Sequence, residues 1–428
     1  MSCLHRLDRP WTAPVIVFAV TVAVFLPPLA IGAPLTLSEA EQRALEADPV
    51  IAQLHAQATA LSERAVADGQ LPDPELSLGI AEVPLNNFDL GDHEDTETQL
   101  GLSQAFPPGH TLRYRTGRMD AMADAERARA LNQRLLVLRD VRSNYIELQY
   151  RQEVGHILDL NRDLFRELAE TAERQYAQGR GNQHDVIRAQ LELSLIEDRI
   201  EETAGAIDVA RAELGKWVGA GDAARPVSAD EPVLPAPPER QELLARLTQH
   251  PLLAAEDASI EAADKSVAIA QEQYKPQWML DFMLSDNTGS AFDLQPGPDF
   301  AGVWLKMSLP IFTNKRQDRT LAASRQEASA ARYGRADRLR DLIQRAESEY
   351  ANLLRLERRL DLYRNRASVE AEQAQEAAFN AYQNNLIDFE TLVRARALAL
   401  ETGLEVLRLH ADSLKTRVNL LYLSGDPS

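Results

Sequence analysis

The sequence predicts a mainly α-helical protein with a small β part, built from two tandem structural repeats. Three observations support this fold class: matching residues recur at a nearly constant spacing, two long blocks contain no proline, and short segments of alternating apolar residues stand between the helical stretches. Together they predict a long α-helical coiled-coil barrel joined to a transmembrane β-barrel, with four strands contributed by each chain of a trimer.

The composition favours long helices. The 428 residues include 46 Lys+Arg and 65 Asp+Glu, which gives a net charge of -19. A nucleic-acid partner is not expected, because such proteins need a basic surface to displace counterions from phosphates. Aromatic residues make up only 6% of the chain, whereas Ala, Leu, Glu and Arg abound. This balance suits extended helices better than a thick globular core.

Residues 1–32 are predicted to be a secretory signal peptide. Arg6 and Arg9 make its start positive, and an uncharged apolar run follows from residue 15 to residue 26. The alternative is an N-terminal membrane anchor, but a span needs about 20 apolar residues and this run is shorter. Cleavage after Gly32 would also remove Cys3, the only cysteine, so the mature chain would contain no thiol and no disulfide.

Matching residues mark two copies of one unit. Helical stretches begin at Pro49 and at Pro251, 202 residues apart, and each ends at a proline 25 residues later. Farther along, the spacing becomes 205 and then 206 residues, so only a few inserted residues separate the copies. The pairs at these larger spacings are Ser103 and Ser308, Tyr145 and Tyr350, Tyr176 and Tyr382, Leu214 and Leu420, and Gly219 and Gly425.

The copies define the domain organisation, in which two repeats flank a proline-rich linker. Each repeat contains a helix, then a β-hairpin, then long helices. The linker has five prolines in 13 residues, which disfavours regular structure. The predicted boundaries are 33–225 for the first repeat, with its hairpin at 75–106 and long helices at 109–218; 226–238 for the linker; and 239–428 for the second repeat, with its hairpin at 277–310 and long helices at 314–424.

The predicted long helices carry a coiled-coil pattern. No proline occurs between Pro108 and Pro226 or between Pro310 and Pro427, so each block is free to be helical. A helix of roughly 70 residues reaches about 100 Å. An antiparallel coiled coil without a channel would explain these helices equally well. The seam of the first copy alternates steps of three and four, at Val186, Ala189, Leu193, Ile196, Ile200, Thr203, Ile207, Ala210 and Leu214.

The predicted strands have one apolar face and one small or polar face. This alternation is typical of a transmembrane barrel wall, with lipid outside and water inside. The alternative is two amphipathic hairpins that cover a soluble core. The residues predicted to face lipid are Leu76, Leu78, Ile80, Leu100, Leu102, Trp278, Leu280, Phe282, Val303, Leu305 and Met307.

Four strands cannot close a membrane barrel, because such barrels have about eight strands or more. Two chains would give eight strands, whose interior is filled by side chains, whereas three chains would give twelve strands and leave a lumen. A duct needs a lumen, so the pattern favours a homotrimer surrounded by outer-membrane lipid.

Several motifs, in this order and duplicated, resemble the TolC family of outer-membrane efflux proteins. They include residues 35–40 (LTLSEA) before Asp48-Pro49, residues 101–106 (GLSQAF) and residues 308–312 (SLPIF). Residues 106–109 (FPPG) resemble the branch associated with heavy-metal pumps of the resistance-nodulation-division class. The resemblance implies a trimeric exit duct in the outer membrane of a Gram-negative bacterium, extending through the periplasm to an adaptor protein and an inner-membrane pump.

The resemblance also assigns the ends of the helical hairpins. The family's tip motif matches Tyr176, Gly179 and Asp185, and in the second copy Tyr382, with Asn385 in place of the glycine and Ile387 where the family has arginine. Asn tolerates a left-handed turn almost as glycine does. The implied adaptor contacts are Tyr176, Gly179, Arg180, Asn182, Tyr382 and Asn385. The implied gate pair is Asp185 and Tyr382. The family's acidic ring falls on Thr391 and Arg394 here, so Asp388 or Glu390 must supply any such ring.

Residues that would carry chemistry are scattered. The eight histidines form no pair at ligand spacing, and the sequence contains no phosphate-binding glycine loop and no nucleophile elbow. No enzyme activity, cofactor or metal centre is therefore expected. The alternatives to an efflux duct are a periplasmic coiled-coil adaptor or scaffold without a pore, and the exit duct of a type I secretion system.

Overall fold

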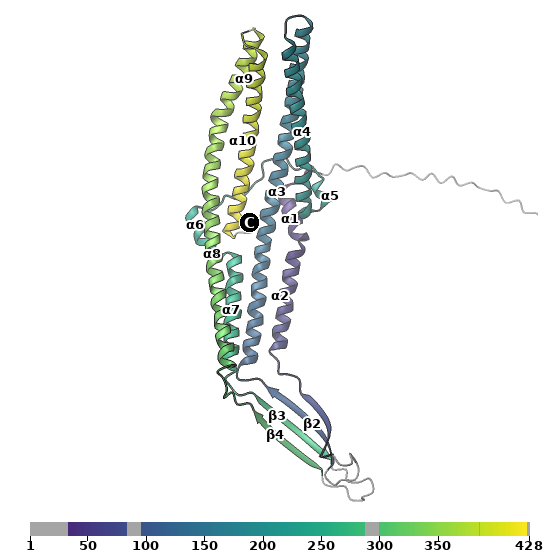
Figure 1. Ribbon diagram of the computed structural model, residues 1–428, viewed down its shortest axis with the longest axis vertical. Helices are drawn as coiled ribbons and strands as arrows, with labels where there is room; N and C mark the ends of the chain where they lie inside the picture. Colours follow the sequence, from purple (N-terminus) through teal and green to yellow (C-terminus); the bar gives the residue numbers. More distant parts are fainter. Residues whose placement is uncertain (1–32, 84–95, 287–298, 385, 426–428) are drawn as a thin grey trace, which may run out of the picture.

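The computed structural model describes residues 33–83, 96–286, 299–384 and 386–425. The molecule is elongated, with a β-sheet at one end and two helical hairpins that reach the other end (Figure 1). Short helices lie about midway along this length, beside the long ones. The prediction of a mainly helical chain with a small antiparallel sheet is confirmed. Among the described residues, none of the helices is long and apolar enough to cross a membrane.

The order of elements follows the predicted pattern in each half. The first half contains α1 (Leu37–Ala47), α2 (Pro49–Asp68), β1 (Glu75–Ala81), β2 (Glu97–Phe106), α3 (Thr111–Ala177), α4 (Gln183–Val218) and α5 (Ala220–Ala223). The second half contains α6 (Arg240–Arg246), η1 (Leu247–Gln249), α7 (Pro251–Glu272), β3 (Trp278–Asp286), β4 (Phe300–Met307), α8 (Gln317–Leu362), η2 (Tyr363–Ala367), α9 (Ser368–Gln383) and α10 (Phe389–Ser424).

Helices α2 and α7 begin in the same way with different caps. Each starts with proline, whose missing N–H is not needed in the first turn. A side chain just before that proline accepts a backbone N–H: Asp48 Oδ1 lies 2.7 Å from Ile51 N, and His250 Nδ1 lies 3.2 Å from Leu252 N. The carboxylate of the first half is therefore replaced by an imidazole in the second.

The long helix of the second half contains one π-turn, η2, between α8 and α9. Tyr145 and Tyr350, before this turn, are 205 residues apart, whereas Tyr176 and Tyr382, after it, are 206 apart. A π-turn closes an i→i+5 hydrogen bond and so takes one residue more than an α-turn. The shift in spacing along the sequence therefore coincides with this turn, which accommodates the additional residue without breaking the helix.

The four strands form one antiparallel sheet in the order β1-β2-β3-β4. Leu76 lies opposite Leu102 in the first hairpin, and Trp278 lies opposite Met307 in the second. The partners in the second hairpin are 202 and 205 residues beyond those in the first, so the two hairpins have the same register. Pairing of β2 with β3 joins the hairpins, and only β1 and β4 have a free edge in the described sheet.

The core lies between helices rather than in one central mass. One cluster, around Val141 and Tyr145 of α3, receives Leu35, Ala40 and Leu214 from the chain start, α1 and α4. Another joins α3, α6, α7, α8 and α10. The Tyr145 hydroxyl donates to the carbonyl of Leu35 at 2.9 Å, and its oxygen accepts from Ser228 N at 3.2 Å. This buried tyrosine therefore connects the chain start to the linker, which a heptad pattern alone does not predict.

The histidine cap of α7 predicts a pH-dependent stability. His250 is buried, its Nδ1 accepts from Leu252 N, and its Nε2 therefore donates to the Tyr422 carbonyl at 3.1 Å. Burial lowers the pKa of His250 below its ordinary value. Because the unfolded chain binds a proton first as pH falls below about 6.5, we expect stability to be full above that pH and to decline below it.

The measurement is the free energy of unfolding of the helical part at several pH values between about 5 and 8. His250→Asn, which can still cap the helix, should show a smaller decline than the parent. Burial also lowers the pKa of His410, so His410→Asn serves as the comparison that measures the other histidine's share. An unchanged pH profile in His250→Asn would contradict the prediction.

Candidate functional site

The sheet presents one face covered with apolar side chains. Residues directly opposite each other in an antiparallel pair point to the same side, so the register places the eleven predicted lipid-facing residues on one face. One row, for example, runs through Leu76, Leu102, Phe282 and Val303. The exposed fractions of the eleven side chains range from 39% to 76%, whereas no core lies beneath them. A surface of this kind marks an interaction with lipid or with another protein.

The opposite face of the sheet, called the polar face below, contains a charge pair. It carries mostly small and polar side chains, together with Met279, Met283, Phe300 and Trp304. Asp281 accepts a hydrogen bond from the Ser103 hydroxyl, and its other oxygen lies 3.1 Å from Lys306 Nζ. These three residues come from β2, β3 and β4. An aspartate between methionines in an otherwise apolar strand was the signal for this contact, but the sequence alone did not show its partners.

The first tip, between α3 and α4, is a tight glycine turn. Gly179 adopts φ 69°, a left-handed conformation that favours glycine. The amides of Arg180 and Gly181 donate to the carbonyl of Gln175 at 2.9 and 3.1 Å, which closes the turn. Tyr176 is 49% exposed, and Asn182 precedes α4 without a side-chain capping bond. These side chains are thus available at the end of the molecule remote from the sheet.

The second tip, between α9 and α10, is built differently. Asp388 accepts a hydrogen bond from Thr391 N at 2.9 Å and so caps α10, and this bonding holds the pKa of Asp388 below its usual range. Glu390 pairs with Arg394 one turn later at 2.8 Å. Asn385 lies outside the described residues. Two of the predicted gate carboxylates are therefore engaged with their own helix.

Tyr382 joins the two tips. Its hydroxyl donates to Gln175 Oε1 at 3.0 Å, and its ring packs edge-on against Phe389 with 5.7 Å between centroids. Burial raises the pKa of Tyr382, and the nearby charge of Asp185 raises it further. Within one chain the tyrosine therefore bonds to Gln175 of α3, while Asp185 acts on it through charge. Gln175 was not identified from the sequence, because the family motif assigns no role to that position.

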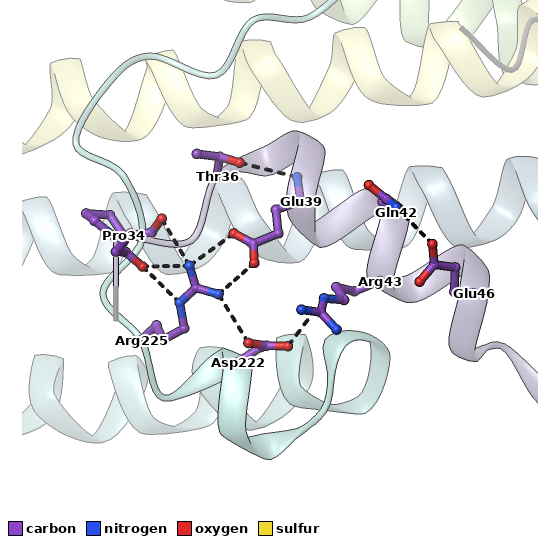
Figure 2. A network of polar contacts seen from close by, with 9 residues as sticks. Pro34, Thr36, Glu39, Gln42, Arg43, Glu46, Asp222 and Arg225 are labelled. Atoms are coloured by element: carbon purple, nitrogen blue, oxygen red, sulfur yellow. Dashed lines mark hydrogen bonds and ion pairs between the residues drawn. The ribbon is translucent and has the colours of Figure 1, made fainter. Parts of the chain in front are cut away.

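A network midway along the molecule fixes the start of the described chain (Figure 2). Arg225 Nη1 and Nη2 lie 2.7 and 3.0 Å from the two carboxylate oxygens of Glu39, and Nη1 lies 3.2 Å from Asp222. Arg225 also donates to the carbonyl of Ala33 from Nη2 at 2.6 Å and from Nε at 2.9 Å. The hydrogen bond from Arg225 lowers the pKa of Glu39.

This network acts together with a short parallel bridge. Leu35 N donates to Pro226 O at 2.8 Å, and Ser228 N donates to Leu35 O at 3.0 Å. Residues on both sides of the predicted linker boundary therefore hold the chain start against α3. No sequence pattern predicts this arrangement, because one arginine after a glycine-rich turn has no distinctive spacing.

Among the residues that the structure describes, no three His, Cys, Asp or Glu side chains are placed to hold one metal ion. The arrangement instead combines an apolar sheet face, a polar sheet face and two exposed helical tips on one elongated chain.

Comparison with known proteins agrees with this geometry. Residues 40–220 match the family model described as "Outer membrane efflux protein". This match covers most of the first half of the chain, including its hairpin and its long helices α3 and α4. The chain is similar to the cobalt-zinc-cadmium resistance protein CzcC of Cupriavidus metallidurans, with 26% identity over 346 residues that cover 78% of this chain and 76% of that protein.

Two solved structures share the fold of this chain. The outer membrane protein VceC of Vibrio cholerae superposes with a TM-score of 0.76 at 19% identity, covering 91% of this chain and 96% of VceC. CusC, whose crystal structures concern folding and transmembrane channel formation, gives a TM-score of 0.77 at 15% identity, covering 91% and 92% of the two chains. The family resemblance inferred from the sequence motifs is thereby confirmed.

Removing the arginine of the central network should loosen the chain start. We expect Arg225→Gln to accelerate hydrogen exchange at the amides of Leu35 and Ser228, because Glu39, Asp222 and the Ala33 carbonyl lose their shared donor. Arg211→Gln is the matched control, since Arg211 pairs only with Asp208 one turn away on the same exposed helix. Equal exchange in the two variants would refute this role.

Proposed function

We propose that three copies of the chain form the outer-membrane exit duct of a tripartite efflux system. Solutes would pass through it passively from the periplasm or pump to the exterior. The observation that carries this proposal is the one-sided sheet: an exposed apolar face and a polar face, joined directly to long helices, in a chain whose residues 40–220 match the outer membrane efflux protein model. A pore-free scaffold would have no use for such a face.

The eleven apolar residues would face lipid, and Asp281, Ser103 and Lys306 would face the lumen. Two free strand edges support closure by neighbouring chains, because unpaired backbone groups are not tolerated in hydrocarbon. Two chains would fill the interior of the barrel with side chains, whereas three would leave a water-filled passage. A homotrimer therefore fits the proposed role.

The proposed organisation follows the boundaries derived from the sequence. A signal peptide, 1–32, would be removed on export, and repeats 33–225 and 239–428, connected by 226–238, would each supply one hairpin and one set of long helices. With the sheet in the outer membrane, α3 alone, at 67 residues, would extend about 100 Å into the periplasm.

The helical tips would contact a periplasmic adaptor, which connects the duct to an inner-membrane pump of the resistance-nodulation-division class. Tyr176, Gly179, Arg180 and Asn182 of the first tip and Tyr382 and Asn385 of the second are the proposed contacts. The energy for transport would come from the pump, and the cargo would be small solutes. The similarity to a cobalt-zinc-cadmium resistance protein makes divalent metal cations the first cargo to test.

Planar bilayers test the duct directly. The purified mature protein should need detergent for extraction from membranes and should produce stepwise channel currents after reconstitution. Extraction without detergent together with an absence of channel events would refute the proposal. A deletion strain challenged with cobalt, zinc, cadmium, dyes and drugs would then identify the cargo.

The tip residues should control the resting conductance. Asp185→Ala combined with Tyr382→Phe removes the charge beside the tyrosine and its bond to Gln175, a bond worth about 0.5–1.5 kcal/mol. We expect a higher single-channel conductance because the two tips are held together less firmly. Glu170→Gln is the comparison, since it removes an exposed carboxylate that pairs with Arg174 on α3 and leaves Asp185 and Tyr382 in place. Conductance equal to that of the parent in the double variant would exclude this gate.

A further inference from the structure

The two edge strands of the described sheet each have one unpaired edge. Strand β1 pairs only with β2, and β4 pairs only with β3. Helix α2 packs on α3, and α8 packs on α7 and α10, among the described elements. Beyond β4, Leu309 and Ile311 are 63% and 70% exposed, although they continue the apolar face of that strand. These surfaces lie at the two lateral boundaries of a single chain.

Within the chain, the two halves join through a defined seam. Strand β2 pairs with β3, and the end of α7 contacts the start of α3. Glu272 of α7 accepts a hydrogen bond from His110 N at 2.7 Å, and Lys275 lies against Gly109. The seam between the two halves therefore has both a strand register and a contact between helix ends. The repeat gives an equivalent residue for each member of these contacts, so the same contacts can be built between neighbouring chains.

The two hairpins show which residues of the strands are equivalent. Both hairpins have the same register when β1 is matched to β3 at a spacing of 202 and β2 to β4 at a spacing of 205. If β4 of one protomer meets β1 of its neighbour as β2 meets β3, each pairing follows from these spacings. The observed pairs between β2 and β3 are Leu102 with Phe282, Gln104 with Leu280, and Phe106 with Trp278. The equivalent pairs between β4 and the neighbour's β1 are, in the same order, Met307 with Ile80, Leu309 with Leu78, and Ile311 with Leu76.

The side chains brought together in these pairs are chemically compatible, which the repeat spacing alone does not require. All six side chains are apolar, and their exposed fractions in one chain range from 43% to 76%. A shift by one residue would place a small residue, Ser77 or Gly79, opposite Leu309, because side chains alternate between faces. The transferred register would extend β4 from Met307, where the strand ends in the single chain, to about residue 311.

The residues that follow α2 and precede α8 have complementary charges. By the same spacings, Lys275 and His110 correspond to Asp73 and Lys315. Asp73 and Lys315 have opposite charges and are exposed, and neither side chain has a hydrogen bond or ion pair with another residue that the structure describes. The carboxylate of Glu272, which pairs with Lys275 and accepts from His110 N within the chain, corresponds to the neutral Gln70. The transferred contact therefore lacks that shared carboxylate, and Asp73 is the anion that remains for Lys315.

We infer that neighbouring chains meet in this register, with β4 of one protomer beside β1 of the next and Lys315 beside Asp73 of that neighbour. The inference rests on the proposed assembly but adds its residue-level geometry. The partner is a second copy of the chain, because β1 and β4 are complementary edges of one repeating sheet. In the assembled duct the ion pair sits at the junction of sheet and helices, where it selects between registers that differ by two residues.

Disulfide trapping tests the register. Because Cys3 is the only cysteine, a Cys3→Ser background provides a chain without thiols. In this background Leu78→Cys with Leu309→Cys should form covalent dimers and trimers under mild oxidation of outer membranes, seen on non-reducing gels and reversed by reductant. The Cα atoms of directly opposite residues lie about 4.5–5.5 Å apart, which is within the range of Cα separations for a disulfide.

Pairs displaced by two residues are the matched controls. Leu78→Cys with Met307→Cys, and Leu78→Cys with Ile311→Cys, would place the two cysteines diagonally, about 7–8 Å apart, and should cross-link far less. A displaced pair that cross-links best would overturn the inferred register. Channel currents without cross-linking of any pair would overturn it too, while leaving the duct intact. A chain that forms neither channels nor oligomers would refute the duct itself.

A charge exchange gives a second measurement that does not need cysteines. Asp73→Lys alone and Lys315→Asp alone should each lower the temperature at which the isolated oligomer dissociates, because each places like charges together. Combining them should restore that temperature to near the parent value. Additive losses in the double variant would overturn the proposed contact between these two residues.

Discussion

The pairing of β2 with β3 fixes the arrangement of everything else in the chain. It joins two hairpins into one sheet, so that one apolar face extends over all four described strands and only two of their edges remain free. Backbone groups on a free edge need partners, and in hydrocarbon they cannot obtain them from water. The same pairing places α7 beside α3 and so sets the spacing between the helical hairpins. The proposed membrane insertion and assembly, and the course of the helices, thus depend on one strand contact.

The extent of the fold was predictable because two simple patterns cover most of it. Proline-free blocks and heptad steps located the long helices, and alternation located the strands to within a few residues. The π-turn η2 was not predictable, since none of its residues breaks a helix, and only the change in repeat spacing hinted at it. Contacts between segments far apart in the sequence, such as Arg225 with Ala33 and Glu39, escaped because local patterns carry no information about them.

The candidate site was predictable in position more than in bonding. Family motifs located both tips, and Gly179 takes the left-handed turn that its place in the motif requires. Tyr382, however, bonds to Gln175, while Asp388 and Glu390 are occupied by Thr391 and Arg394. A motif specifies which residue types stand where, but the choice among nearby polar partners depends on distances of an ångström or less. The two tips therefore share a sequence pattern and differ in chemistry.

The seam between the two halves of a chain and the inferred seam between neighbouring chains differ for a physical reason. Halves of one chain are held together by a linker, so the effective concentration of one for the other is high and the contact needs little specificity. Its helix ends accordingly use a local pair, Lys275 with Glu272, that does not distinguish one neighbour from another. Separate chains have no such linker and must find the correct register by their own contacts. Exposed opposite charges, brought together only in that register, add a preference there, whereas apolar rows alone would accept a slip of two residues.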